Sequence, residues 1–205
     1  MDNLAKLFGS QQKIRLMRLF LMHMDTAFEI DELKTKTKIR IATLKKDLVW
    51  LINASVVKKQ NRITKTPRGA KKVTSVYMLN PKCSFKNELY SIVAPKGDTI
   101  ISTLQSRFKK TGKIDLLVAS GFFMHHEDAR IDLLIVGKNL KKQKIESTIA
   151  SLETEIGKEL LYAFFDTQDF LYRAHMYDKL IRDVIDFSHI KVVDTGILSR
   201  VPKMS

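Results

Sequence analysis

RIATLKKDLVWLINASVVKKQNRITKTPRGAKKVTSVYML, residues 40–79, is the stretch that decides how the N-terminal part of the chain folds. Its beginning places apolar residues at helical spacing, at Ile41, Leu44, Leu48 and Leu51 or Ile52. That spacing predicts a helix with one buried stripe. Val56 to Lys59 and Val73 to Leu79 have the composition of strands, and the connection between them, QNRITKTPRGAKK, contains the turn residues Pro67 and Gly69. The stretch therefore predicts a helix followed by a hairpin.

Two further helices are expected before this stretch. Between Gln11 and Met24 apolar residues recur near helical spacing while basic residues fill the other face. A short extended piece, Ala27 to Ile30, precedes Asp31, which can accept hydrogen bonds from the first amides of a helix running to about Thr37. Three helices followed by a basic hairpin predict a winged helix-turn-helix domain in residues 1–80.

Positive charge is concentrated in this same region. The 205-residue chain has 36 Lys and Arg against 22 Asp and Glu, a formal net charge of +14. Residues 1–80 hold 17 of the basic residues and only 6 acids, whereas the other 125 residues hold 19 and 16. A basic block on one small domain is typical of a protein that binds the phosphate backbone of nucleic acid. Because 44% of the residues are hydrophobic, the chain can form folded cores, and a disordered polycation is not expected.

Two sets of side chains are the candidates for contact with duplex DNA. The first turns of the third helix would lie in the major groove, and their outward positions are Arg40, Thr43, Lys45 and Lys46. The hairpin would hold the backbone or enter a minor groove with Lys58, Lys59, Arg62, Lys65, Arg68, Lys71 and Lys72. The alternative for the hairpin is a solvated element whose lysines only keep the protein soluble. Trp50, late in the helix, is interpreted as core or dimer packing rather than as a base-stacking residue.

A second, α/β domain is expected at residues 98–205, after a connector at 81–97 that contains a short helix from Phe85 to Val93. Two apolar runs, from Ile114 and from Ile131, have the composition of buried strands and flank the polar turn MHHEDAR. The elements expected after them are a helix at 140–156, a strand at 160–165, helices capped by Asp166 or Thr167 and by Asp178, and a strand at 190–193. The chain as a whole is thus expected to be α+β.

Cysteine and histidine positions limit the chemistry of the chain. Cys83 is the single cysteine, which excludes an intramolecular disulfide and a multi-cysteine zinc site and fits a reducing cytosol. His125 and His126 with Glu127 and Asp128 could be read as a metal cluster, but adjacent histidines in a short turn rarely reach one ion, so a solvated turn is favoured.

Charges interrupt every N-terminal apolar stretch before it reaches the length of a signal peptide or a membrane span. These features predict a soluble cytoplasmic protein without a membrane partner, metal or cofactor.

Helix, strand, short polar turn and a strand ending in IDLLIVG make residues 98–194 resemble the core of the DNA polymerase beta-like nucleotidyltransferases, especially the minimal type. In that family a Gly-Ser pair closes the first strand, and an Asp-x-Asp pair at the second strand holds metal ions on the nucleotide phosphates. Gly121 matches the glycine and Asp132 the second aspartate, but Phe122 and Arg130 stand where the serine and the first aspartate belong. Two divalent ions need several carboxylate oxygens, so the resemblance implies a domain without catalytic residues. Asp132 would then be a strand-end acid paired with Arg130 or a nearby lysine.

The order of the two domains resembles a group of small prokaryotic proteins classed as transcriptional regulators. The likeness begins near LFGSQQKIRLMRLF and continues to DTQDFLYRAHMYDKLIRDVI, so it spans nearly the whole chain. It implies a non-enzymatic, sequence-specific regulator that binds double-stranded DNA as a homodimer, with a second domain for dimerisation or for an unknown small-molecule effector. Two alternatives are an active nucleotidyltransferase that uses the basic domain to hold its substrate, and an RNA-binding or partner-binding module.

Overall fold

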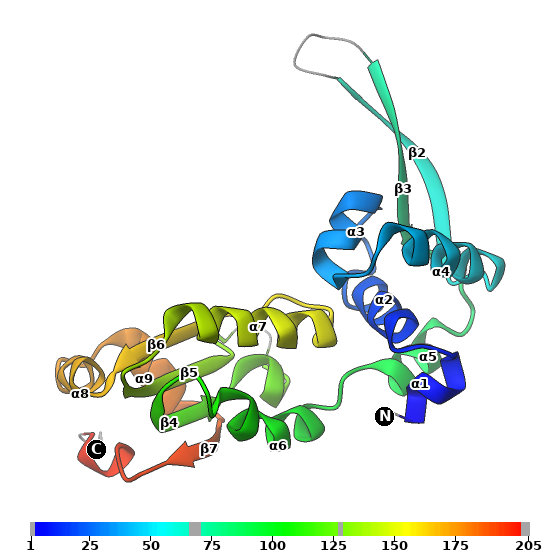
Figure 1. The fold of residues 1–205 in the computed structure, drawn as a ribbon. Helices are drawn as coiled ribbons and strands as arrows, with labels where there is room; N and C mark the ends of the chain where they lie inside the picture. The colour runs from blue at the N-terminus through cyan, green and yellow to red at the C-terminus, as the bar shows by residue number, and fades with distance from the viewer. Residues whose placement is uncertain (1–2, 66–70, 127–128, 202–205) are drawn as a thin grey trace. The chain divides into compact units, whose positions relative to one another are not determined.

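The computed structural model describes residues 3–65, 71–126 and 129–201. It has a mixed α+β fold, which confirms the expected fold class at that level. The chain divides into two compact units, Met1–Pro95 with Glu153–Lys158 and Lys96–Leu152 with Glu159–Ser205. Each unit contains its own sheet (Figure 1).

The first unit contains the four helices expected from the sequence and one further short helix at its beginning. They are α1 (Asn3–Phe8), α2 (Gln11–Met22), α3 (Ile30–Thr37), α4 (Ile41–Asn53) and α5 (Lys86–Val93). The Ser10 side chain caps α2 by accepting a hydrogen bond from the Lys13 amide at 3.1 Å.

The N-cap of α3 differs from the prediction. The helix begins at Ile30 with Glu29 as its N-cap, and Glu29 and Glu32 form a capping box in which the Glu32 carboxylate accepts a hydrogen bond from the Glu29 amide at 2.7 Å. Asp31 therefore lies in the first turn, and its assignment as the cap was wrong. Two glutamates spaced three residues apart satisfy the amides reciprocally, which a single aspartate two residues later cannot do.

An antiparallel sheet with the order β1-β3-β2 completes the first unit. Its strands are β1 (Phe28–Glu29), β2 (Val57–Lys65) and β3 (Lys71–Leu79). β2 and β3 stay in register from the pair Val57↔Leu79 to the pair Lys65↔Lys71. Both strands are longer than predicted, because the expected connection QNRITKTPRGAKK supplies strand residues at each end. Residues 60–63 are exposed on both faces of the ribbon, so they lack the alternation that marks a half-buried strand.

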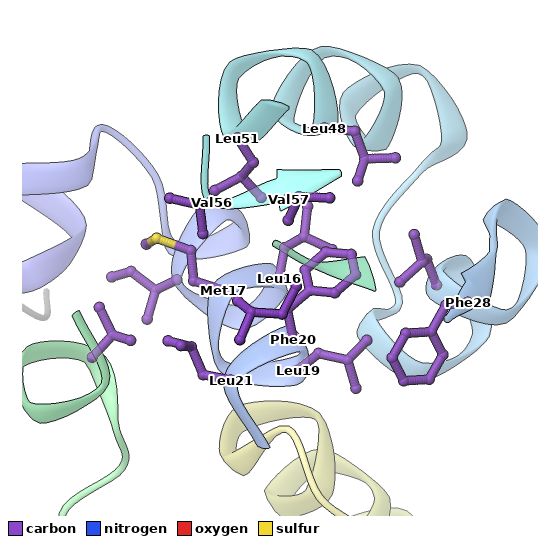
Figure 2. Close-up of a cluster of buried hydrophobic side chains, with 14 of the residues drawn as sticks. Leu16, Met17, Leu19, Phe20, Leu21, Phe28, Leu48, Leu51, Val56 and Val57 are labelled. Carbon is purple, nitrogen blue, oxygen red and sulfur yellow. The ribbon is translucent and has the colours of Figure 1, made fainter. Parts of the chain in front are cut away.

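One apolar cluster forms the core of the first unit (Figure 2). Phe20 of α2 and Leu51 of α4 are fully buried in it, and Leu48 is 1% exposed. The rings of Phe20 and Phe28 meet edge to face with centroids 6.0 Å apart. The helical stripe expected in the third helix is therefore part of this core.

The segment expected to be a connector contributes to this core. Cys83, Leu89 and Val93 are buried in the same cluster, and α5 packs against α2. Arg18 of α2 donates a hydrogen bond from Nε to the Val93 carbonyl at 2.5 Å. The first compact unit accordingly extends to Pro95 rather than ending near residue 80.

A mixed sheet with the order β6-β5-β4-β7 forms the second unit. Its strands are β4 (Lys113–Ala119), β5 (Leu133–Lys138), β6 (Tyr162–Asp166) and β7 (Ile190–Asp194). Only β5 and β6 run parallel among these described strands. The helical elements are α6 (Gly97–Phe108), η1 (Gly121–Met124), α7 (Lys142–Ile156), α8 (Thr167–His175), α9 (Lys179–Asp186) and η2 (Leu198–Arg200). The apolar run after Ile114 is therefore a strand followed by a 3-10 turn.

Helices cover the sheet of the second unit on the face that Leu116 and Leu134 point to. Phe170 of α8 and Ile181 of α9 share a buried cluster with these residues. Leu117 and Ile135 alternate with them along the strands, so they point to the opposite face, and both are fully buried. The continuous apolar strands are thus buried on both faces, as expected.

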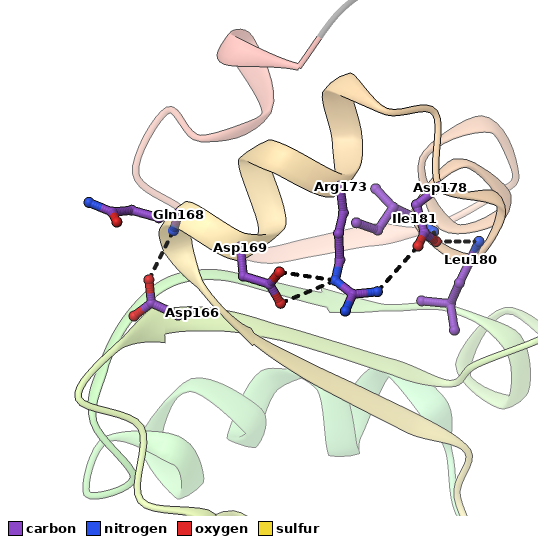
Figure 3. A network of polar contacts seen from close by, with 7 residues as sticks. All are labelled: Asp166, Gln168, Asp169, Arg173, Asp178, Leu180 and Ile181. Atoms are coloured by element: carbon purple, nitrogen blue, oxygen red, sulfur yellow. Dashed lines mark hydrogen bonds and ion pairs between the residues drawn. The ribbon is translucent and has the colours of Figure 1, made fainter.

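Two aspartates cap the helices at the positions predicted for them. Asp166 Oδ1 accepts a hydrogen bond from the Gln168 amide at 2.9 Å, and Asp178 Oδ1 accepts one from the Leu180 amide at 2.9 Å (Figure 3). Arg173 lies between them and donates to both oxygens of Asp169 at 3.1 Å. In the described part of the chain, no helix is both long and apolar enough to cross a bilayer.

Candidate nucleic-acid interface

The first two turns of α4 carry one set of predicted contact residues. Arg40 is the exposed N-cap of the helix, and Lys45 and Lys46 are exposed beside it. Thr43 is half-buried. Leu44 is fully buried on the opposite side, so the core fixes which face of the helix presents the cations.

The hairpin carries the second set. Lys59, Arg62 and Lys71 are exposed, and Lys58 is half-buried. Two others lie on the paired strands, at Lys65↔Lys71 and Thr64↔Lys72, and the structure describes only their backbone. Arg68 lies outside the described residues.

Backbone hydrogen bonds join α4 directly to the base of the hairpin. The Val56 amide donates to the Leu51 carbonyl at 3.0 Å, and the Asn80 amide donates to the Val56 carbonyl at 2.8 Å. The Asn80 side chain also donates to the Ser55 carbonyl at 2.9 Å. The helix end and both hairpin strands are therefore fixed to one another within the first unit.

The hairpin's cations have no acidic residue near them in the sequence. The sequence contains no acidic residue between Asp47 and Glu88. Across the described ranges, neither Arg62 nor Lys71 lies within ion-pair distance of a carboxylate. Exposed cations without acidic partners repel one another, and an anionic ligand would relieve that repulsion.

Asp47 is a buried acid in α4 that the sequence reading did not identify. Its side chain is 4% exposed, and its Oδ2 accepts no hydrogen bond from the described residues. Burial raises the pKa of Asp47, and the nearby charges of Lys13 and Lys46 partly oppose that rise. Its position three residues after Leu44, on the buried stripe, was the signal that could have revealed it.

Trp50 lies at the surface of α4. Its side chain is 40% exposed, and the Lys13 ammonium lies 4.6 Å from its ring centroid, a cation–π geometry. The interpretation of Trp50 as a core residue was wrong, because the core stripe passes through Leu51 instead. Dimer packing by Trp50 stays a prediction.

Asp132 in the second unit has a different role from the surface pairing expected for it. It is 6% exposed, and its Oδ1 accepts a hydrogen bond from the Phe122 amide at 2.6 Å. Its Oδ2 accepts one from the Leu161 amide at 2.8 Å. Arg130 pairs with Asp183 instead, so the predicted ion pair with Asp132 was wrong. The carboxylate links the 3-10 turn after β4 to the segment before β6.

Gly121 is required by this arrangement. Its φ is +51°, and a Cβ at this position would clash with Asp132 Oδ1. The glycine that matches the nucleotidyltransferase pattern therefore makes room for the buried carboxylate. Both oxygens of that carboxylate accept hydrogen bonds from backbone amides.

The histidine turn shows no metal site in its described part. His125 and His126 are exposed, whereas Glu127 and Asp128 lie outside the described residues. Elsewhere among the described side chains, no group of three His, Cys, Asp or Glu could hold a metal ion.

A small cavity of about 200 Å³ lies beside Gly121 in the second unit. Apolar atoms of Ile131, Val184 and Phe187 line it, together with the ion-paired Arg130.

Comparison of the chain with protein-family models, with curated proteins and with solved structures found no match in any of the three.

Proposed function

We propose that the chain is a non-enzymatic transcriptional regulator whose first unit is a winged helix-turn-helix that binds duplex DNA. α3 and α4 would form the helix-turn-helix, with Arg40, Thr43, Lys45 and Lys46 in the major groove. The β2–β3 hairpin would be the wing, and its cations would hold the phosphate backbone. The observation that carries the proposal is the acid-free stretch between Asp47 and Glu88, which places exposed, unpaired cations on a hairpin fixed to α4.

A homodimer follows from the small number of base contacts that one such unit can make. Two copies on two half-sites double those contacts, and the spacing of the half-sites then adds specificity. The second unit would supply dimerisation, or it would bind an unknown small-molecule effector in the cavity beside Arg130.

Nucleotidyl transfer has less support than DNA binding. Asp132 is the aspartate that would hold metal ions, but its two oxygens accept hydrogen bonds from Phe122 and Leu161. Arg130 stands where the first aspartate of the Asp-x-Asp pair belongs, and it pairs with Asp183, so that position supplies no carboxylate for a pair of metal ions.

The proposal is tested by removing two cations from α4. A duplex is first chosen by in vitro selection with the whole protein, and its affinity is then measured across salt concentrations. The double variant Arg40→Gln and Lys46→Gln should bind more weakly, and the slope of log affinity against log salt should fall by about 0.9 for each phosphate that the variant no longer neutralises.

A matched control removes the same charge from the second unit. Lys109 and Lys110 are exposed, and the variant Lys109→Gln with Lys110→Gln should leave affinity and slope close to those of the natural protein. Equal weakening by both variants would mean that net charge alone drives binding, and unchanged affinity of the α4 variant would contradict the proposal.

A further inference from the structure

The distal part of the hairpin carries an exposed apolar pair. Ile63 of β2 lies directly opposite Val73 of β3, and the two residues are 65% and 62% exposed. Directly paired residues of antiparallel strands project from the same face, with Cβ atoms about 4.5–5.5 Å apart. The pair therefore forms one continuous apolar surface on a polar ribbon.

The pair lies on the two-stranded portion of the described sheet. β1 joins β3 at Phe28↔Tyr77 and Glu29↔Val76, and the described ribbon continues past these pairs with only β2 and β3. An isolated two-stranded ribbon gains some stability from any β-branched pair. That stabilisation would be the same if the two side chains were covered, so it does not explain their exposure.

The ribbon that carries the apolar pair is also cationic. By alternation, Lys71 and Lys59 share its face, and Arg62 projects from the opposite face. All three are exposed, and the hairpin sequence contains no acid. A second copy of the same ribbon would be repelled by this charge, whereas a polyanion with apolar walls would be attracted.

The neighbouring pair on the same face is polar. Asn61 lies opposite Ser75, one step nearer the core than the apolar pair. Asn61 is exposed, so its amide can donate to the acceptors that A·T base pairs present in the minor groove. Ile63 and Val73 have no side-chain donor or acceptor, so they can recognise a groove only by its shape.

Resting on the proposed function, we propose that Ile63 and Val73 enter the minor groove of the bound duplex and wedge between base pairs. Apolar wedges of this kind unstack a base step and bend the duplex by about 20–90°. The cations around the pair would then contact the phosphates that border the groove. Specificity from the hairpin would come from the groove's width and deformability rather than from major-groove base edges.

The first test compares two double variants of the full chain on the selected duplex. Ile63→Thr with Val73→Thr keeps both residues β-branched but adds hydroxyls, and it should weaken binding about tenfold to a hundredfold and reduce the bend. The matched variant Ile63→Val with Val73→Ile keeps the apolar volume and should retain both properties. Bending is measured by energy transfer between dyes at the duplex ends, and ribbon pairing by amide NMR shifts.

The salt slope separates the wedge from the cations. The threonine variant should keep the natural slope because it removes no charge, whereas Arg62→Gln with Lys71→Gln should lower it by up to about 1.8. Inosine in place of guanosine changes the minor groove alone, and deoxyuridine in place of thymidine removes only a major-groove methyl. Inosine should alter binding by the natural protein and have less effect on the threonine variant, while deoxyuridine should affect both proteins equally.

Two results would overturn the proposal while leaving DNA binding intact. One is natural affinity and bending by a threonine variant whose ribbon is paired. The other is a threonine variant that responds to inosine as the natural protein does but no longer responds to deoxyuridine. That result would place the pair in the major groove. Absence of salt-dependent duplex binding by the natural protein would instead overturn the proposed function itself.

Discussion

The two units of the molecule use their charged side chains differently. In the second unit Arg130 pairs with Asp183, and Arg173 pairs with Asp169 and Asp178. On the hairpin of the first unit, Arg62 and Lys71 have no such partner among the described residues. Surface ion pairs add little stability, typically under about 1 kcal/mol each, but they neutralise charge locally. Charge left without partners adds no stability to the fold, and under the proposed function the phosphates of DNA would neutralise it.

The largest expected effect separates the two units by their cores. Phe20→Ala should lower the free energy of unfolding of the first unit by about 3–5 kcal/mol, because a fully buried ring is replaced by a cavity. Trp50 is the single tryptophan and lies in the first unit, so its fluorescence during urea unfolding reports on that unit.

Phe170→Ala is the matched change in the second unit, where this ring is also fully buried. It should leave the Trp50 transition nearly unchanged while lowering the midpoint followed by far-UV circular dichroism. Equal displacement of the Trp50 transition by both variants would show that the two units unfold as one and would remove the contrast between them.

An intermediate effect is expected from the buried carboxylate of the second unit. Asp132→Ala removes the two hydrogen bonds that this carboxylate accepts from the Phe122 and Leu161 amides, and a hydrogen bond to a charged group contributes about 1.5–3 kcal/mol. Thermal unfolding should therefore show a clear loss of stability, with duplex affinity unchanged at a temperature where the variant is folded.

The same variant distinguishes a structural from a catalytic aspartate. Incubation of the natural protein with labelled nucleotides and magnesium should give no incorporation. Incorporation that disappears in a folded Asp132→Ala protein would favour the nucleotidyltransferase alternative instead.

The smallest effect concerns Asp47 in α4. Burial raises the pKa of Asp47 in the folded protein, so the folded state binds its proton more tightly than the unfolded state does. Stability contributed by this group is therefore greatest below its ordinary pKa of 3.8 and is lost as the pH rises through the raised folded value. Asp47→Asn should add up to about 1 kcal/mol at pH 7 and progressively less as the pH falls toward 3.8. Urea unfolding at several pH values measures this, and a pH-independent difference would contradict the assignment.

Local signals in the sequence were sufficient for several elements. Asp178 could be assigned as a cap, and the cap of α8 could be narrowed to Asp166 or Thr167, because a cap depends only on the next few residues. The stripe through Leu44 and Leu48 likewise identified the buried face of α4. The extent of the hairpin could not be read in this way, because exposed residues such as Arg62 leave no alternating pattern.

Tertiary contacts decided what the sequence could not. Asp132 resembles a metal-binding aspartate by its position in IDLLIVG, but its partners, Phe122 and Leu161, come from separate segments. The place of Asp47 on the apolar stripe of α4 indicates that it is buried, but only the packed structure shows that its Oδ2 accepts no hydrogen bond from the described residues. The cations on α4 and the hairpin could be identified from the sequence, but only the structure shows that Arg62 and Lys71 have no ion-pair partner among the described residues.

The register of the β2–β3 hairpin also limits how the length of the hairpin can change in evolution. Side chains alternate between faces from Val57↔Leu79 outward, so losing one residue from β2 would transfer every later side chain of that strand to the reverse side. The apolar pair at Ile63 and Val73 would then be split across the two sides. Related proteins with a longer or shorter hairpin should therefore differ by an even number of residues in each strand, with matching changes in β2 and β3.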